Sequence, residues 1–315
     1  MSPDAINVKK RNGRGLEPLD IQKIHSMVKY ACEGLAGVSE SQVEMSSGLQ
    51  FYDGMSTDDI QQILIKSASD LITLESPNYQ YVAARLLLFS LRKSLHHRLW
   101  EHPTLLDHIK KCIDLGVYDK GILVWYTDEE IQAMGDLIKH ERDYLFSYAG
   151  LRQVVDKYLV QDRSTGNIFE TPQFMYMMIA ATLFRNYPID KRYDYVKKYY
   201  NAISNHLINI PTPVMAGVRT PLRQFASCVL VDSDDTLPSI FTSDMAIGRY
   251  VSQRAGIGIN AGRIRGINSR IRGGEVQHTG VIPFLKKFEA TVKCCTQNGV
   301  RGGSATVHFP IWHQE

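Results

Sequence analysis

Residues 225–231, FASCVLV, form a short and largely apolar run. A run of this length is typical of a strand that is buried on both faces, as in a parallel sheet. Two further runs of the same kind follow, AGIGIN at residues 255–260 and ATVHF at residues 305–309. Longer helical stretches separate the three runs, and connections of that length favour parallel pairing. The C-terminal third of the chain is therefore predicted to be an α/β domain.

Three parallel strands alone make a poor core, because such a sheet needs cover on both faces and neighbours at both edges. A chain that stops at Glu315 leaves apolar surface and a strand edge exposed. We therefore expect the domain over residues 221–315 to be unfinished. Pro211, Pro213 and Pro221 break helical periodicity ahead of it and mark the entry into this domain.

The composition is that of an ordinary globular protein. The 315 residues are 44% hydrophobic and 22% charged, and the length allows two or three domains. No apolar run is long enough to span a bilayer, and the N-terminus lacks the apolar core of a signal peptide. A net charge of +3 is too small to indicate nucleic acid binding. We expect neither membrane nor nucleic acid as a partner.

The cysteines are sparse and odd in number, and no secretory signal accompanies them. This pattern favours a reducing compartment, and we expect a cytoplasmic location. The adjacent pair Cys294 and Cys295 has the wrong spacing for a zinc knuckle. His96, His97 and His102 lie near a helix end, but no carboxylate or further histidine completes a ligand set, so no metal is predicted.

Residues 1–98 read as a hairpin followed by four amphipathic helices. The turn is predicted within residues 8–14, because Asn-Gly favours the positive φ angles of a tight hairpin. The helices are predicted to begin after Asp20, at the capping-box pattern of residues 39–42, near Ile60, and at Ser76-Pro77 with proline at the first helical position.

Several basic side chains are spread over this hairpin and its helices. They are Lys9, Lys10, Arg11, Lys23, Arg92 and Lys93. If the bundle brings them together, they form an anion pocket suited to a triphosphate. Otherwise they are a solvated basic surface. Residues 99–220 are predicted to be a helical domain, with a capped start at Thr127 and a turn at residues 163–167.

Four segments of the first domain resemble, in order, the ATP-cone of ribonucleotide reductase large subunits, a regulatory nucleotide-binding domain. They are KRNG at 10–13, DIQKI at 20–24, FYDGMSTDDI at 51–60 and YQYVAARL at 79–86. The resemblance implies an effector nucleotide contacted by Lys10, Glu17, Lys23, Thr57 and Lys93. Close bacterial relatives carry histidines where this chain has Gln61 and Ser90, so nucleotide binding with weak shut-off by dATP is implied.

The rest of the chain resembles the class I ribonucleotide reductase large subunit. The segments that carry this resemblance are TP at 212–213, RQFASCVL at 223–230, QRAGIGINAGRIR at 253–265, IRGGE at 271–275 and GVRGG at 299–303. The fold implied is α/β. A mainly helical N-terminal region, the ATP-cone of residues 1–98 and the helical domain of residues 99–220, precedes the first strands of an incomplete ten-stranded α/β barrel over residues 221–315.

The activity implied is the replacement of a ribonucleotide 2′-hydroxyl by hydrogen. In the family, a thiyl radical removes the 3′-hydrogen, and two further cysteines supply two electrons and become a disulfide. Cys228 matches the first of these reducing cysteines, a role that suits a thiol; without the resemblance it would be an inert packing residue. Thr212, Ser227 and Gly256 match positions that contact substrate. A disulfide from Cys228 to the pair 294–295 is a weaker alternative.

The resemblance also implies an effector site that selects which base is reduced and lies at a dimer interface. Its residues would be Asp235, Thr236, Leu237, Arg265 and Arg272. An acid can bond a ribose hydroxyl, and arginines can clamp phosphate oxygens. Residues 295–303 would form the glycine-rich loop that passes this signal to the substrate.

The family's radical cysteine, second reducing cysteine and shuttle cysteines would lie beyond Glu315. The partners implied are a complementary C-terminal large-subunit polypeptide, a small subunit with a di-metal tyrosyl radical, a second large subunit in a dimer, and thioredoxin or glutaredoxin. No cofactor is expected in this chain besides ATP and dNTP effectors. The alternative is a free-standing, non-catalytic nucleotide-binding regulator; retention of Cys228, Thr212 and Ser227 favours the reductase.

Overall fold

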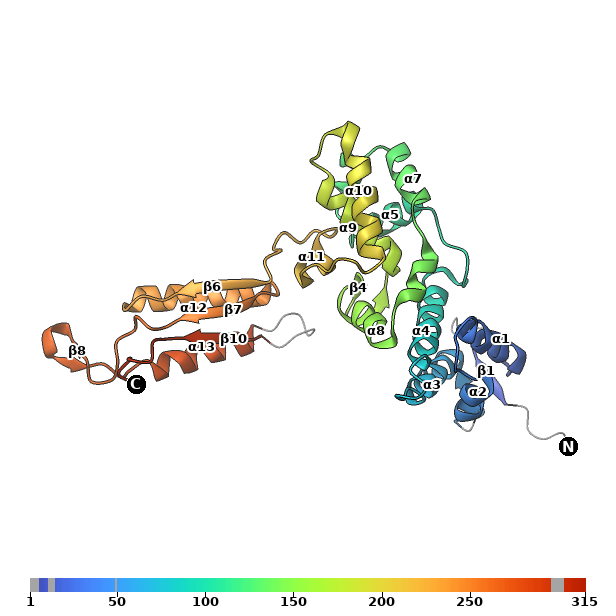
Figure 1. Ribbon diagram of the computed structural model, residues 1–315. Helices are drawn as coiled ribbons and strands as arrows, with labels where there is room; N and C mark the ends of the chain where they lie inside the picture. Colours follow the sequence, from blue (N-terminus) through green and yellow to red (C-terminus); the bar gives the residue numbers. More distant parts are fainter. Residues whose placement is uncertain (1–5, 11–14, 49, 296–302) are drawn as a thin grey trace. The chain divides into compact units, whose positions relative to one another are not determined.

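The computed structural model describes residues 6–10, 15–48, 50–295 and 303–315. The chain divides into two compact units (Figure 1), each of which is described by itself. Unit 1 consists of Met1–Asn209 with Arg219–Pro221, and unit 2 of Ile210–Val218 with Leu222–Glu315. Within the described ranges, no helix combines the length and the apolarity needed to cross a membrane.

Unit 1 opens with a small sheet of strand order β2-β1-β3. Strands β1 (Asn7–Lys9) and β2 (Leu16–Pro18) pair antiparallel, which confirms the predicted hairpin. The predicted turn at Asn12-Gly13 lies outside the described residues. Strand β3 (Met55–Ser56) adds to β1 in parallel and was not expected, because two residues are too few for a period-two pattern.

Four helices complete the first part of unit 1, as the apolar spacing predicts. They are α1 (Ile21–Cys32), α2 (Glu40–Gly48), α3 (Thr57–Asp70) and α4 (Tyr79–His96). The Asp20 carboxylate accepts a hydrogen bond from the Gln22 N–H and caps α1. Helix α4 begins two residues later than predicted, although the Pro77 carbonyl still accepts from the Gln80 N–H in a tight first turn.

The rest of unit 1 is a helical domain built around α9 (Pro172–Phe184). Nearly every residue of α9 is buried, as expected for a helix that is apolar on all sides. A full capping box at Thr127 begins α7, which confirms that predicted start. The other elements are α5 (Leu105–Asp114), α6 (Ile122–Trp125), α7 (Asp128–Asp136), η1 (His140–Leu145), α8 (Tyr148–Lys157), α10 (Ile189–Ser204), and the short strands β4 (Gln161–Asp162) and β5 (Asn167–Ile168).

Unit 2 contains the predicted parallel sheet, in the order β10-β7-β6. Strands β6 (Cys228–Asp232), β7 (Gly256–Asn260) and β10 (Ala305–His308) match the three apolar runs. Helices α12 (Leu237–Ser252) and α13 (Ile282–Cys294) lie along the strands (Figure 1). The smaller elements are α11 (Thr212–Gly217), β8 (Arg270–Ile271), η2 (Arg272–Gly274) and β9 (Val276–Gln277).

The prediction that residues 225–231 are buried on both faces is wrong. Val229 and Val231 pack into the core between the sheet and the helices α12 and α13, but Cys228 is exposed and Leu230 is 85% exposed. The two helices cover one face of the sheet, and the opposite face of β6 is open. The described strands do not close into a barrel, as expected for an incomplete one.

Candidate functional site

Cys228 stands at the start of β6, directly opposite Gly256 in the parallel register. The Gly256 N–H donates to the Ser227 carbonyl at 2.8 Å, which fixes the two strands beside the thiol. A side chain at position 256 would place its Cβ 4.0 Å from the Cys228 Sγ. Glycine therefore leaves free space next to an exposed thiol on the open face of the sheet.

The structure brings three of the four predicted substrate and redox residues together. Ser227 precedes Cys228 in the chain, and Gly256 faces it across the strand pair. Thr212 begins the separate short helix α11, and we find no hydrogen bond from it to the other three within the described ranges. Its place beside them stays a prediction.

The alternative disulfide from Cys228 to the pair 294–295 has no geometric support. Cys294 ends α13, and its Sγ lies 3.8 Å from the Sγ of Cys295. Cys295 also adjoins α12, since a Cβ at Gly248 would stand 3.3 Å from its Sγ. The pair therefore belongs to the helical layer, whereas Cys228 points to the open face. Burial and the neighbouring Cys294 raise the pKa of the Cys295 thiol.

The predicted specificity residues gather at the end of the sheet where α12 begins. The Asp235 carboxylate accepts from the Arg265 backbone N–H at 2.9 Å and from its Nε at 2.6 Å. Thr236 caps α12 through a hydrogen bond from the Ser239 N–H, and Leu237 is 54% exposed in the first turn of that helix. The acid and one of the arginines are thus already paired with each other.

Arg272 lies in an excursion from the parallel sheet, the segment between β7 and α13 that contains β8, η2 and β9. Its φ angle is 50°, and Gly273 and Gly274 have φ angles of 70° and 101°. Only glycine adopts such angles at little cost, which explains the glycine pair after Arg272. The Arg265 guanidinium donates to the Arg270 carbonyl at 3.0 Å and so ties this excursion to the Asp235 pair.

One charged residue of this cluster was missed in the sequence. The Arg263 guanidinium lies 3.2 Å from the Asp232 carboxylate and 3.4 Å from that of Asp234. Three aspartates at and just after the end of β6 and two arginines after β7 are the signal that could have found it, because the carboxyl ends of adjacent parallel strands lie at one edge of the sheet. The predicted glycine-rich loop lies mostly outside the described residues.

Two of the predicted cone residues meet across the hairpin of unit 1. The Lys10 ammonium lies 2.6 Å from the Glu17 carboxylate. Thr57 is the next residue after the paired positions Lys9 and Ser56, so it begins α3 beside Lys10. A helix N-terminus next to a lysine favours an anion.

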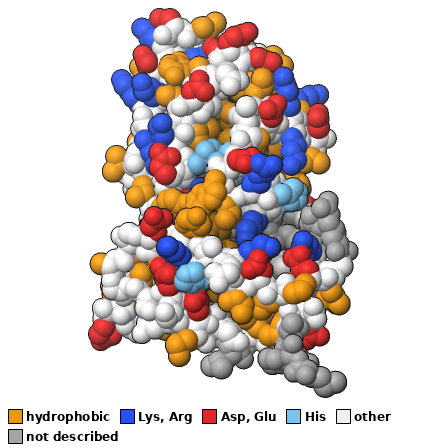
Figure 2. All heavy atoms as spheres, turned by 90° about the vertical axis from the view of Figure 1, so that its right-hand side faces the viewer, with side chains coloured by type: hydrophobic (Ala, Val, Ile, Leu, Met, Phe, Trp, Pro, Cys, Tyr) orange, Lys and Arg blue, Asp and Glu red, His pale blue; other side chains and the backbone are white. Residues whose placement is uncertain are grey.

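The two remaining cone lysines border the same part of α1. The Lys93 Nζ of α4 lies 3.7 Å from the Met27 Sδ, and Lys23 is one turn before Met27. The face of the molecule in Figure 2 shows basic and acidic side chains interspersed. Any anion site here therefore depends on particular residues rather than on a broad basic surface.

The two departures from the ATP-cone pattern lie next to each other. Gln61 is 3% exposed, and its Nε2 donates to the Leu86 carbonyl at 2.9 Å. Ser90 follows Leu86 by one helical turn on α4. Position 61 is thus occupied by an amide that bonds the backbone of the neighbouring helix.

Three domain families match successive parts of this chain. Residues 6–94 match the ATP cone domain, residues 144–223 the all-alpha domain of ribonucleotide reductase, and residues 226–315 its barrel domain. The chain belongs to the ribonucleotide reductase large-subunit family. The resemblance of its motifs to this enzyme family is confirmed.

Curated relatives agree over almost the whole chain. It is 54% identical to ribonucleoside-diphosphate reductase 1 subunit alpha of Salmonella typhimurium and 53% identical to that of Escherichia coli, over 99% and 98% of its length. The subunit alpha of Enterobacteria phage T4 is 48% identical over 98% of the chain. The matched region is 41%, 40% and 41% of these three relatives, so the chain spans about two fifths of their length.

Proposed function

We propose that this chain supplies the nucleotide-binding regions and the first redox cysteine of a ribonucleoside-diphosphate reductase, which makes deoxyribonucleotides for DNA synthesis in the cytoplasm. The observation that carries the proposal is the exposed Cys228 thiol opposite Gly256, on the open face of a partial sheet. A thiol that only fills a core is buried. This thiol is instead exposed on the open face of the sheet, where another group can approach it.

The proposed reaction balances with two thiols. The ribose loses its 2′-hydroxyl as water and gains a hydrogen at that carbon, while two cysteine thiols lose two hydrogens and become one disulfide. Cys228 supplies one thiol, and a cysteine of the remaining barrel supplies the other. Thioredoxin or glutaredoxin then reduces the disulfide by thiol–disulfide exchange.

The remaining barrel is proposed to come from a complementary C-terminal large-subunit polypeptide. The uncovered face of β6 and the unclosed sheet support a need for additional strands. The radical is proposed to come from a separate small subunit with a di-metal tyrosyl cofactor, and the large subunits are proposed to pair as a dimer. Thr212 and Ser227 are proposed to contact the substrate.

Two effector sites are proposed in addition. A dNTP would bind where Asp235, Thr236 and Leu237 meet the arginines 265 and 272, and it would exchange part of the existing Asp235–Arg265 pair for its ribose and phosphate groups. ATP would bind the cone near Lys10 and Thr57. The alternative function is a non-catalytic nucleotide-binding regulator. Such a regulator would share these effector sites but would not require a redox thiol at Cys228.

Reconstitution with the complementary polypeptide and the small subunit tests the proposal. We expect the mixture to reduce ribonucleoside diphosphates, and Cys228→Ser to assemble normally but to lose multiple turnover. Cys294→Ser, another exposed cysteine of unit 2, is the matched control and keeps turnover. A mixture that assembles, binds effector and never reduces substrate would favour the regulator.

A further inference from the structure

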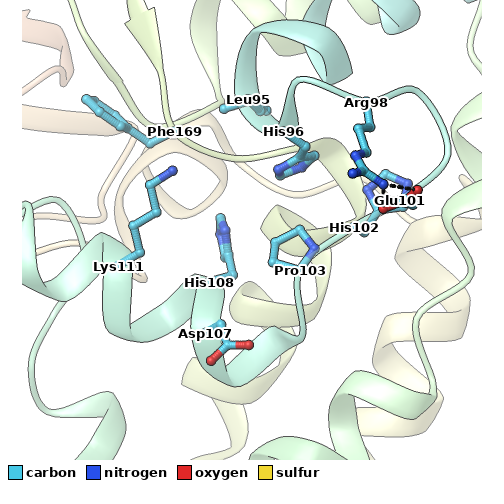
Figure 3. A pocket seen from close by; sticks show the side chains of 10 residues that line it. All are labelled: Leu95, His96, Arg98, Glu101, His102, Pro103, Asp107, His108, Lys111 and Phe169. Carbon is cyan, nitrogen blue, oxygen red and sulfur yellow. Dashed lines mark hydrogen bonds and ion pairs between the residues drawn. The ribbon is translucent and has the colours of Figure 1, made fainter.

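A cavity of about 350 Å³ lies in unit 1, and none of its lining residues belongs to the sites proposed above. It opens between the last turn of α4 and helix α5 (Figure 3). Its size is at the lower end of the range for small-molecule sites. The lining residues are Leu95, His96, Arg98, Glu101, His102, Pro103, Asp107, His108, Lys111 and Phe169.

All three imidazoles in its wall are uncharged at neutral pH, and burial lowers the pKa of His102 to about 3. Burial lowers the pKa of His108 to about 3 and that of His96 to about 4, and the positive charge of Lys111 contributes to both shifts. The Lys111 ammonium is thus close enough to act on both rings. The wall combines polar, neutral rings with this lysine.

The position of the proton on His108 follows from its neighbours. The Tyr118 hydroxyl donates its single hydrogen to Glu170 Oε2 at 2.5 Å. Tyr118 can then only accept from His108 Nε2, 3.1 Å away, so the ring hydrogen is on Nε2. The Nδ1 atom is left with a lone pair. The His108 residue as a whole is 3% exposed. Its Nδ1 atom is not one of the fully buried ring nitrogens that lack a hydrogen-bond partner, so this atom is accessible from the cavity.

Lys111 is the cation that the cavity leaves without a counter-ion. Arg98 pairs with Glu101 at the rim. Asp107 points away from the cavity in Figure 3 and accepts from the Thr104 hydroxyl at 2.7 Å. Among the residues that the structure describes, none forms an ion pair with Lys111. An anion in the cavity would therefore find a free ammonium group.

The apolar part of the wall and the histidines narrow the ligand further. Leu95, Pro103 and Phe169 add apolar surface to the wall. Within the described part of the chain, no three histidine, cysteine or acidic side chains are placed to hold a metal ion. The wall is thus suited to an organic anion rather than to a metal.

We propose that this cavity binds a small organic oxyanion, a carboxylate or a phosphate monoester, with a small apolar body and one hydrogen-bond donor. The oxyanion contacts the Lys111 ammonium. The donor, a hydroxyl or a protonated phosphate oxygen, bonds His108 Nδ1. The apolar body lies against the apolar part of the wall.

Isothermal titration of the full chain at neutral pH tests this site. The probes are 3- and 4-hydroxybenzoate and phenyl phosphate, with benzoate and inorganic phosphate as partial ligands. We expect saturable binding of at least one of the first three, and weaker binding of both partial ligands. Tighter binding of a hydroxybenzoate assigns the site to carboxylates, and tighter binding of phenyl phosphate assigns it to phosphate monoesters.

A pair of adjacent lysines provides the matched variants. Lys111→Gln removes the proposed ion partner and should weaken binding by about tenfold or more, as expected for the loss of a charged hydrogen bond. Lys110→Gln removes a lysine that instead pairs with Asp128 at 3.1 Å, and should change affinity by less than about twofold. Both side chains are on the surface of α5, so we expect both variants to fold, and circular dichroism checks this.

Three results would overturn the proposal. The first is the absence of saturable binding of any probe up to about 10 mM, which is weaker than a specific contact with an ammonium group allows. The second is equal binding by Lys111→Gln and Lys110→Gln. The third is stoichiometric zinc binding that blocks the probes, which would make the histidines a metal site. Because none of these residues belongs to the reductase sites, the outcome is independent of the proposed activity.

Discussion

Replacing Glu170 by glutamine should destabilise unit 1 strongly. Glu170 and Arg219 are both fully buried and form an ion pair. The Arg219 Nε donates to Glu170 Oε2 at 2.8 Å, and a second guanidinium nitrogen donates to Oε1. Tyr118 and the Val160 N–H complete the carboxylate's hydrogen bonds at 2.5 and 2.6 Å. Every contact of this carboxylate is thus with a donor.

The expected loss follows from these contacts. Glutamine is neutral, and it places an NH₂ group among donors, so the buried Arg219 charge loses its partner. Removing one partner of a buried ion pair costs about 3–5 kcal/mol. We expect Glu170→Gln to lower the free energy of unfolding by about 4 kcal/mol. With a urea dependence of about 3 kcal/mol per M, the midpoint falls by roughly 1.3 M.

Urea titration followed by tryptophan fluorescence and circular dichroism measures this change. Trp100 and Trp125 lie in unit 1 and report on it. Glu141→Gln, an exposed change in the same unit, is the control and should shift the free energy by less than about 0.5 kcal/mol. The double variant Glu170→Gln/Arg219→Met should be less destabilised than the single one, because no buried charge is left unpaired. A loss below about 1 kcal/mol for Glu170→Gln would refute the reasoning.

Three other predictions follow from the structure. Mild oxidation should give no disulfide between Cys228 and the pair 294–295, and a peptide with that cross-link in a mass spectrum would contradict the assignment to opposite sides of the sheet. Unit 1 should lose stability between pH 7 and pH 5, by about 2 kcal/mol for each histidine that stays neutral in the folded state, measured by urea titration. Burial lowers the pKa of His96 to about 4, of His102 and His108 to about 3 and of His140 to about 2, so the unfolded chain takes up protons first as the pH falls below about 6.5. Burial raises the pKa of Asp143 to about 6, which offsets a small part of the loss. The reconstituted enzyme should bind ATP but show weak inhibition by dATP, and strong inhibition in a turnover assay would show that the cone tolerates its departures from the family.

The sequence predicted those elements whose cause is local. Asp20 and Thr127 begin helices because their side chains bond the first backbone N–H groups, a signal that needs no tertiary structure. The three parallel strands were recognisable by their apolar runs and long connections. The location of Cys228 within a motif also marked it before any geometry was known.

Features that depend on distant neighbours could not be predicted. An apolar run does not report how many layers cover it, so the open face beside Leu230 was missed. Glu170 and Arg219 are 49 positions apart, and neither lies in a pattern that announces a buried pair. The cavity beside Lys111 forms where the end of α4, the segment leading into and along α5, and Phe169 come together. The domain boundaries at 98/99 and 220/221 and the substrate role of Thr212 stay predictions.

The unclosed sheet of unit 2 has a consequence for how the protein can be handled. Within the described strands, β6 and β10 each pair on one side only, so both edges carry backbone groups able to accept another strand. Such edges can form hydrogen bonds with any accessible strand, including the edge strands of identical molecules. Residues 222–315 produced without a complement should therefore self-associate and precipitate, and co-expression with the rest of the barrel should rescue their solubility.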